Sequence, residues 1–253
     1  MKTAVLLLQG VLIIALMAAC TTESSRKMAR SHLDLGTAYL ESGSYTSALK
    51  EFLEAEKLTP RDPETHFHLG VAYYEAGLME KAARKFQKAV KYKPGYSVAH
   101  NYLGTVYMRT GRYDEAIQEF TATLSDDLYG TPVLALNNLG WAYYKKGNYT
   151  MALVKYREAL KRAPNTNILF LIQKNMGIAY FAENKIDKAI SYLETSLETA
   201  PYIPESHYWL AMSYLKNGKY TNALSEFRET VKLNPTSEYG RKAKKQIDTL
   251  LEQ

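Results

Sequence analysis

Cysteine, glycine, proline and long runs of like charge are all scarce in this sequence. Its 253 residues include one cysteine, Cys20, so no disulfide can form within a single chain. Gly (14) and Pro (8) are too few for a collagen-like or linker-like chain. Hydrophobic residues make up 46% and charged residues 23%, an ordinary globular balance, so we do not expect disorder.

The positive charge is spread along the chain. Lys and Arg number 32 against 26 Asp and Glu, which gives a formal net charge of +6. Such an excess suits nucleic acid or an anionic surface. However, the cations are interleaved with Glu, and the longest basic block is residues 241–245 (RKAKK). A solvated face explains this pattern adequately, so we expect no nucleic-acid partner.

The N-terminal residues 1–19 have the layout of a secretory signal. Lys2 gives a positive start, and residues 4–19 are almost wholly apolar and end in Ala18-Ala19 before Cys20. This stretch is short for a membrane-spanning helix, and the small residues suit a signal peptidase. An ordinary cleaved signal followed by a coincidental cysteine is the alternative.

Residues 16–20 (LMAAC) resemble the bacterial lipoprotein box, with Met17 in the place usually held by Leu. The resemblance implies cleavage between Ala19 and Cys20 and acylation of Cys20, with palmitate among the chains. Two or three acyl chains would hold a protein stably on a bilayer. Thr21 after the cysteine resembles an outer-membrane sorting signal, which implies a periplasm-facing, lipid-anchored protein. Residues 20–28, polar after Cys20, are interpreted as a tether.

A motif recurs every 34–37 residues. It starts with Leu-Gly or a close variant, at residues 35–36, 69–70, 103–104, 139–140, 176–177 and 210–211. A tyrosine follows three places later: Tyr39, Tyr73, Tyr107, Tyr143, Tyr180 and Tyr214. An alanine follows nine places after that: Ala48, Ala82, Ala116, Ala152, Ala189 and Ala223. Four places on stands an apolar residue: Phe52, Phe86, Phe120, Tyr156, Leu193 and Phe227. A Gly or Asn lies between tyrosine and alanine: Gly43, Gly77, Gly111, Gly147, Asn184 and Gly218.

This pattern resembles the tetratricopeptide repeat, a helix–turn–helix hairpin. Gly and Ala allow close helix packing, the intervening Gly or Asn breaks the hairpin, and a closing Pro ends the second helix of five units. The sequence therefore predicts an all-α fold, a right-handed α-solenoid of about six repeats. Their ranges are 29–62, 63–96, 97–132, 133–166, 170–203 and 204–237.

The last segment, residues 238–253, predicts an amphipathic helix with Ile247, Leu250 and Leu251 on one face. A solenoid needs a polar-backed end cap, so we interpret this helix as that cap. A partner-binding tail is the alternative.

No residue pattern predicts catalysis, a cofactor, a small-molecule substrate or a metal. His32, His66, His100 and His207 hold the fourth place of their repeats, so they should lie about 10 Å apart. Metal ligands must lie at about 2 Å from the ion. We expect these rings to fill slots between helices. The sequence has no nucleophile elbow and no glycine-rich phosphate loop. We therefore do not expect the protein to be an enzyme.

The first helix of each hairpin should line the concave face that tetratricopeptide proteins offer to partners. Spacing of i, i+4, i+7 places one stripe per repeat on that face. The candidate groove residues are Phe67, Val71, Tyr74, Asn101, Thr105, Met108, Asn137, Trp141, Tyr144, Lys174, Ile178, Phe181, Tyr208, Met212 and Leu215. This apolar set favours an amphipathic helix or an extended apolar segment. Val71, Ile178 and Met212 fit the core between repeats as well as they fit the groove. Trp141 and Tyr144 fit the groove better than the core.

In its lipobox, its six repeats and its length, the chain resembles the outer-membrane lipoprotein pilotins of type IV pilus systems, of the PilF, PilW and Tgl kind. That resemblance implies binding to the secretin subunit and assistance in its outer-membrane localisation and oligomerisation. The alternative is an envelope adaptor with the same parts, which docks proteins such as peptidoglycan hydrolases.

Overall fold

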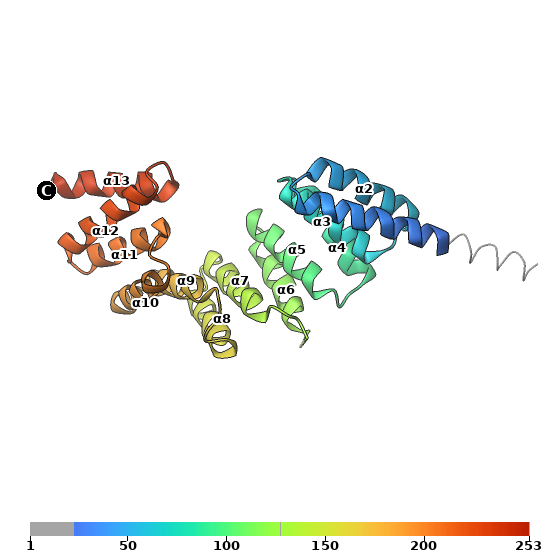
Figure 1. Ribbon diagram of the computed structural model, residues 1–253. Helices are drawn as coiled ribbons and strands as arrows, with labels where there is room; N and C mark the ends of the chain where they lie inside the picture. Colours follow the sequence, from blue (N-terminus) through green and yellow to red (C-terminus); the bar gives the residue numbers. More distant parts are fainter. Residues whose placement is uncertain (1–22, 127, 253) are drawn as a thin grey trace, which may run out of the picture. The chain divides into compact units, whose positions relative to one another are not determined.

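The computed structural model describes residues 23–126 and 128–252, and within these ranges the chain forms helices and no strand. Residues 23–41 lie in the first helix (Figure 1). The others are α2 (Tyr45–Leu58), α3 (Pro63–Glu75), α4 (Met79–Tyr92), α5 (Ser97–Arg109), α6 (Tyr113–Leu124), α7 (Pro132–Lys145), α8 (Tyr149–Arg162), α9 (Leu169–Ala182), α10 (Ile186–Thr199), α11 (Pro204–Lys216), α12 (Tyr220–Leu233) and α13 (Glu238–Leu251). The predicted all-α hairpin architecture is confirmed.

The chain falls into two units, Met1–Arg112 and Tyr113–Gln253. In the first, α2 packs on α3, α3 on α4 and α4 on α5. In the second, each helix from α6 to α13 packs on the next along the chain. The sequence does not mark this division, because the unit boundary falls inside the turn of the third repeat motif.

Left-handed backbone closes the hairpins. Among the described residues, six have positive φ, and they are the turn residues that the motif singles out: Gly43, Gly77, Gly111, Gly147, Asn184 and Gly218. Glycine adopts this conformation without steric cost, and Asn tolerates it better than most residues.

The motif's alanines and large apolar residues form the hairpin cores. Ala82 and Ala152 are fully buried, as are Phe86 and Tyr156 one helical turn later. The other fully buried phenylalanines, Phe52, Phe120 and Phe227, occupy the same motif position. Helix packing therefore rests on the residues that define the repeat.

Two features at the ends of the described chain differ from the sequence interpretation: the start of the first helix and the apolar face of α13. Residues 23–28, assigned to the tether, are helical and continue into the first repeat. They contain an i, i+4 pair of Glu23 and Lys27, 3.5 Å apart, which favours helix although Met28 is the one apolar residue among them. In α13, Ile247 and Leu250 pack against the preceding hairpin, but Leu251 is 63% exposed and does not share their face.

Candidate functional site: the inner helix faces

The candidate groove residues lie on the first helices of successive hairpins. Those of the first unit are on α3 and α5, and those of the second unit are on α7, α9 and α11. In the second unit α7 contacts α9, α9 contacts α11 and α11 contacts α13. These four helices therefore form one continuous row, which places α13 at the end of the same face.

Burial divides the fifteen candidates into two groups. Nine are half-buried: Phe67, Tyr74, Thr105, Met108, Trp141, Tyr144, Phe181, Met212 and Leu215. Six are buried: Val71, Asn101, Asn137, Lys174, Ile178 and Tyr208. Ile178 has no exposed surface, so it is a core residue and is unavailable to a partner. Val71, 8% exposed, is also mainly a packing residue.

Trp141 and Tyr144 form a half-buried aromatic pair on α7. Their rings stack with centroids 4.7 Å apart at an interplanar angle of 9°, and the Lys145 ammonium lies 4.9 Å above the Trp141 ring. Tyr144 also packs against the buried cluster around Tyr156, whereas Trp141 is not part of that cluster. Burial, followed by the nearby Tyr149 and Glu205, raises the pKa of Tyr144.

Several buried polar residues of this face in the second unit pair with one another. Lys174 on α9 pairs with Glu205 on α11, and Tyr239 on α13 donates a hydrogen bond of 2.7 Å to the same carboxylate. The Asn175 side chain donates to Asn137 across α9 and α7 at 3.0 Å. Lys174, a predicted groove residue, is therefore occupied by an internal partner and does not offer a free charge.

Sequence reasoning missed three residues of this face. Glu205 and Tyr239 complete the ion pair, and Trp209 packs edge-on against Phe181 with centroids 5.3 Å apart. Glu205 holds the second place of its repeat, one turn before Tyr208. A stripe started one turn earlier would have included it, and extension of the stripes to the last helix would have included Tyr239.

In the first unit, Phe67 lies within an aromatic cluster. Its ring centroid is 5.3 Å from Tyr96, 5.5 Å from Tyr102 and 5.9 Å from Phe86. Burial, followed by Glu64 and Asp62, raises the pKa of Tyr96 to about 12, so this phenol stays neutral. Phe67 is thus mainly a packing residue. Tyr74, with the Arg109 guanidinium 4.5 Å over its ring, is more accessible.

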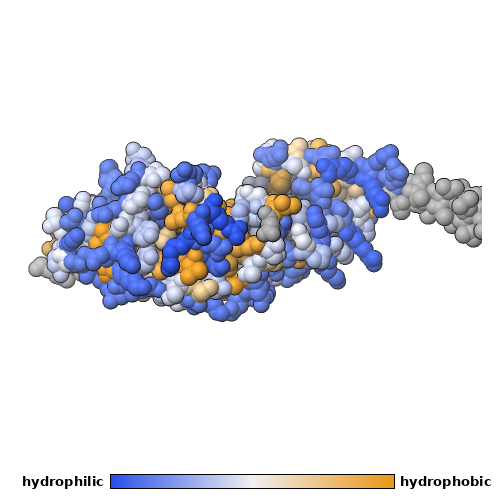
Figure 2. Space-filling view, turned by 90° about the horizontal axis from the view of Figure 1, so that it is seen from below, coloured by the Kyte–Doolittle hydropathy of each residue, from blue (hydrophilic) through white to orange (hydrophobic). Residues whose placement is uncertain are grey.

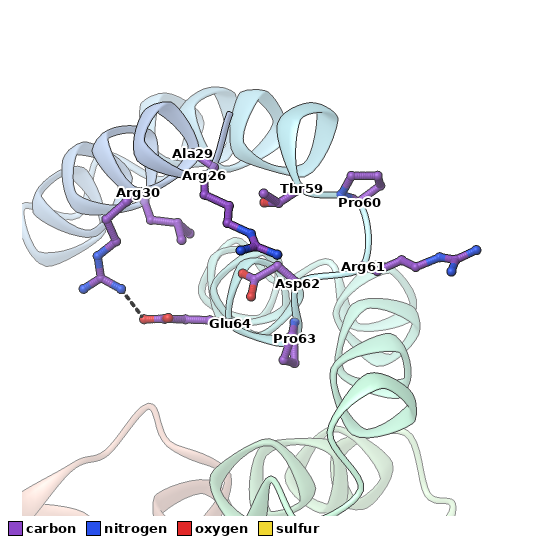
Figure 3. A pocket seen from close by; sticks show the side chains of 10 residues that line it. Arg26, Ala29, Arg30, Thr59, Pro60, Arg61, Asp62, Pro63 and Glu64 are labelled. Carbon is purple, nitrogen blue, oxygen red and sulfur yellow. Dashed lines mark hydrogen bonds and ion pairs between the residues drawn. The ribbon is translucent and has the colours of Figure 1, made fainter. Parts of the chain in front are cut away.

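A pocket of about 560 Å³ lies between the first helix and residues 59–64, next to the start of α3 (Figure 3). Its apolar floor includes Ala29 and Leu33. Arg30 crosses it to Glu64 at 2.9 Å, while Arg61 points away from it. Its charges are of both signs and largely compensate one another, so it does not select a ligand of either charge.

Apolar side chains reach the surface in several groups among hydrophilic ones (Figure 2). Over the described residues, no helix has the length and hydropathy needed to cross a bilayer. Nor do those residues bring three or more His, Cys, Asp or Glu side chains together as a metal site. Ala19 and Cys20, the predicted cleavage and lipidation site, lie outside the described residues.

Family models match the repeats over most of the chain. A model described as "TPR repeat" matches residues 36–77, and models described as "Tetratricopeptide repeat" match 63–96, 96–165, 135–201 and 174–238. The chain belongs to the tetratricopeptide-repeat family. Members of this family are scaffolds for protein interactions, in agreement with the aromatic, charge-compensated face described above.

Individual relatives are more distant. Human protein O-mannosyl-transferase TMTC2 is 29% identical over 102 residues, which are 40% of this chain and 12% of the relative. The chain thus spans a small part of that curated relative. Pseudomonas aeruginosa PilF is a structural neighbour with a TM-score of 0.73 at 18% identity, over 88% of this chain and 99% of PilF. PilW, a type IV pilus biogenesis factor, gives 0.75 at 19% identity, over 85% and 97%. At such identities these two likenesses concern the fold alone.

Proposed function

We propose that this tetratricopeptide protein is a type IV pilus pilotin. In this proposal it is lipid-anchored to the outer membrane through Cys20 and faces the periplasm. It binds an apolar or amphipathic segment of the secretin subunit and assists the subunit's outer-membrane localisation and oligomerisation.

The observation that carries the binding part is the stacked pair Trp141 and Tyr144 on a face whose buried Lys174 is neutralised by Glu205. The cations Lys145 and Lys216 lie over the rings of Trp141 and Phe181, so they are spread along the face and do not form the cluster that an acidic carboxy-terminal tail would need. Half-buried Phe181, Met212 and Leu215 add apolar surface on the neighbouring helices. An amphipathic helix or extended apolar segment matches such a surface, because its apolar side chains leave water without leaving a charge unpaired.

The pilus part of the proposal is supported by the architecture. The likeness to PilF and PilW extends over nearly the whole of both neighbours, so all their repeats have counterparts here. Together with the lipobox-like residues 16–20, this motivates the choice of the secretin as partner. The likeness by itself concerns the fold.

Deletion of the gene tests the proposal directly. Membranes from the deletion strain should contain monomeric secretin in place of the heat-resistant multimers, as seen on an immunoblot. Unchanged multimers would exclude the pilotin function. Intact multimers together with altered peptidoglycan hydrolysis would instead point to an adaptor of the envelope.

The anchor has its own test, a Cys20→Ser chain in the deletion strain. We expect this variant to leave the membrane fraction and to lose incorporation of labelled palmitate. Continued acylation, or membrane association equal to that of the unchanged chain, would contradict an anchor at Cys20 without bearing on the binding face.

A further inference from the structure

Helix α4 carries the excess positive charge of the first unit. Residues 23–112 contain 14 Lys and Arg against 10 Asp and Glu, whereas α4 (Met79–Tyr92) alone contains five against one. The rest of this unit is therefore balanced. Within the first unit, the excess of cations is thus confined to this one helix.

Four of these cations form one stripe. Lys81, Arg84, Lys88 and Lys91 follow at steps of three, four and three residues, which places them on one side of the helix, and all are exposed. They extend over about 15 Å at 1.5 Å per residue. The opposite side of α4 buries Ala82, Ala83, Phe86 and Ala89. We call Lys81, Arg84, Lys88 and Lys91 the α4 stripe.

Internal ion pairs leave most of the α4 stripe uncompensated. Glu56 pairs mainly with Lys85, beside the stripe, and lies 3.4 Å from Lys88. Across the part of the chain that the structure describes, no carboxylate lies within ion-pair distance of Arg84 or Lys91. Cations therefore outnumber carboxylates on this side of α4, where Glu80 is the exposed carboxylate of the helix.

We propose that the α4 stripe binds the anionic headgroups of a membrane. The exposed apolar side chains at this helix, Leu78 and Tyr92, lie at its two ends, so the middle of the stripe has none of the apolar anchors that dominate protein interfaces, from which Lys is depleted. Headgroup binding needs only charge and tolerates flexible Lys side chains. The stripe belongs to the unit whose sequence contains Cys20. A cluster of cations can act as a second membrane signal beside an acyl anchor, but its attraction to headgroups does not require that anchor.

Vesicle flotation of the full-length chain tests this proposal. The probes are vesicles of phosphatidylcholine with and without phosphatidylglycerol, at low and at high salt. The test variant is Arg84→Gln with Lys91→Gln. The matched control is Arg61→Gln with Lys50→Gln, which removes the same charges from exposed positions of the same unit. Binding to phosphatidylcholine alone reports on the apolar N-terminal segment and not on the α4 stripe.

We expect the phosphatidylglycerol-dependent affinity of the test variant to be about 30-fold lower at low salt. This follows because each of the two removed cations contributes about 1 kcal/mol near an anionic surface. The control should retain it, and high salt should abolish the difference. Equal losses in both variants, or none in either, would overturn the proposal. So would a test variant that keeps vesicle binding but loses binding to polyglutamate, since that outcome identifies an acidic protein segment as the partner.

Discussion

Gly140 on α7 faces Tyr156 on α8 with no room for a side chain. A Cβ at Gly140 would lie 2.5 Å from Cε1 of the fully buried Tyr156 ring. The same contact recurs in the first unit, where a Cβ at Gly70 would lie 2.5 Å from Cε1 of Phe86. This close approach explains why the repeat pairs a glycine with an aromatic residue.

Gly140→Ala should therefore destabilise the second unit. The Tyr156 ring is enclosed and must shift, and overpacking of this kind costs about 1–3 kcal/mol. Urea unfolding followed by circular dichroism measures the loss. Gly130→Ala is the matched control in the same unit, because nothing lies within 4 Å of its Cβ position and its φ is not positive. Similar unfolding midpoints for the two variants would contradict the close-packing explanation.

The hairpin interiors are the part of the fold most predictable from sequence. Close approach requires glycine or alanine, and the left-handed turn requires Gly or Asn, so sterics leave few alternatives at positions such as Gly147, Asn184 and Ala152. The helix before residue 29 was not predictable in this way. Apart from Met28, its residues 23–28 are polar or small, and its helical state depends on continuation of the hairpin helix that follows.

The inner face was less predictable, because one helical stripe contains both accessible and buried residues. Trp141 is half-buried as expected, but Ile178 at the equivalent place of the next repeat is fully buried. The difference depends on the neighbouring helices and not on the residue's own repeat. Likewise, Lys174 looks like a free cation in the sequence of its own repeat. In the structure it pairs with the carboxylate of Glu205, which lies on another hairpin.

Protonation of His207 should stabilise the second unit. Its Nε2 lies 2.8 Å from the Pro201 carbonyl oxygen and its Nδ1 lies 2.6 Å from a Glu226 carboxylate oxygen, so both ring nitrogens must donate. Burial opposes the charge, but the bonds to Glu226 and Pro201, with Glu229 nearby, raise the pKa above its usual 6.5. The stabilisation should be fully present below the unfolded pKa of about 6.5. It should be lost as the pH rises through the higher folded pKa.

The measurement compares urea unfolding of the unchanged chain and His207→Gln across this pH range. The variant should be less stable at low pH, and the difference should shrink as the pH rises. His66 provides an internal contrast, because burial lowers its pKa despite the Pro60 carbonyl and Glu56. Its contribution must have the opposite sign, with stability lost as the pH falls through about 6.5. A pH-independent difference for His207→Gln would contradict the charged state of this ring.

Removal of the Glu205 charge should cost more stability than removal of an exposed one. Glu205→Gln leaves the Lys174 ammonium, 8% exposed as a residue, without its carboxylate, which should cost about 1–3 kcal/mol. Glu158→Gln is the control: Glu158 pairs with Lys155 and Arg162 at the surface and should contribute less than about 1 kcal/mol. Adding Lys174→Met to Glu205→Gln should restore part of the loss. Absence of any coupling between the two substitutions would show that the pair is not a stabilising unit.

Trp141→Ala should weaken partner binding without unfolding the protein. Trp141 lies outside the buried cluster and stacks only on Tyr144 of the same helix among the described aromatic contacts, so its loss opens no core cavity. If it anchors an apolar segment, its truncation should cost about 2 kcal/mol or more of binding energy, roughly a 30-fold rise in Kd. Tyr144→Ala should reduce both binding and stability, since Tyr144 also packs against the cluster.

Calorimetric titration with secretin-derived peptides gives the Kd, and Tyr202→Ala, at a residue 79% exposed, is the control. An unchanged Kd for Trp141→Ala would exclude this stack as the binding surface, and a loss of helical circular dichroism would make Trp141 a core residue.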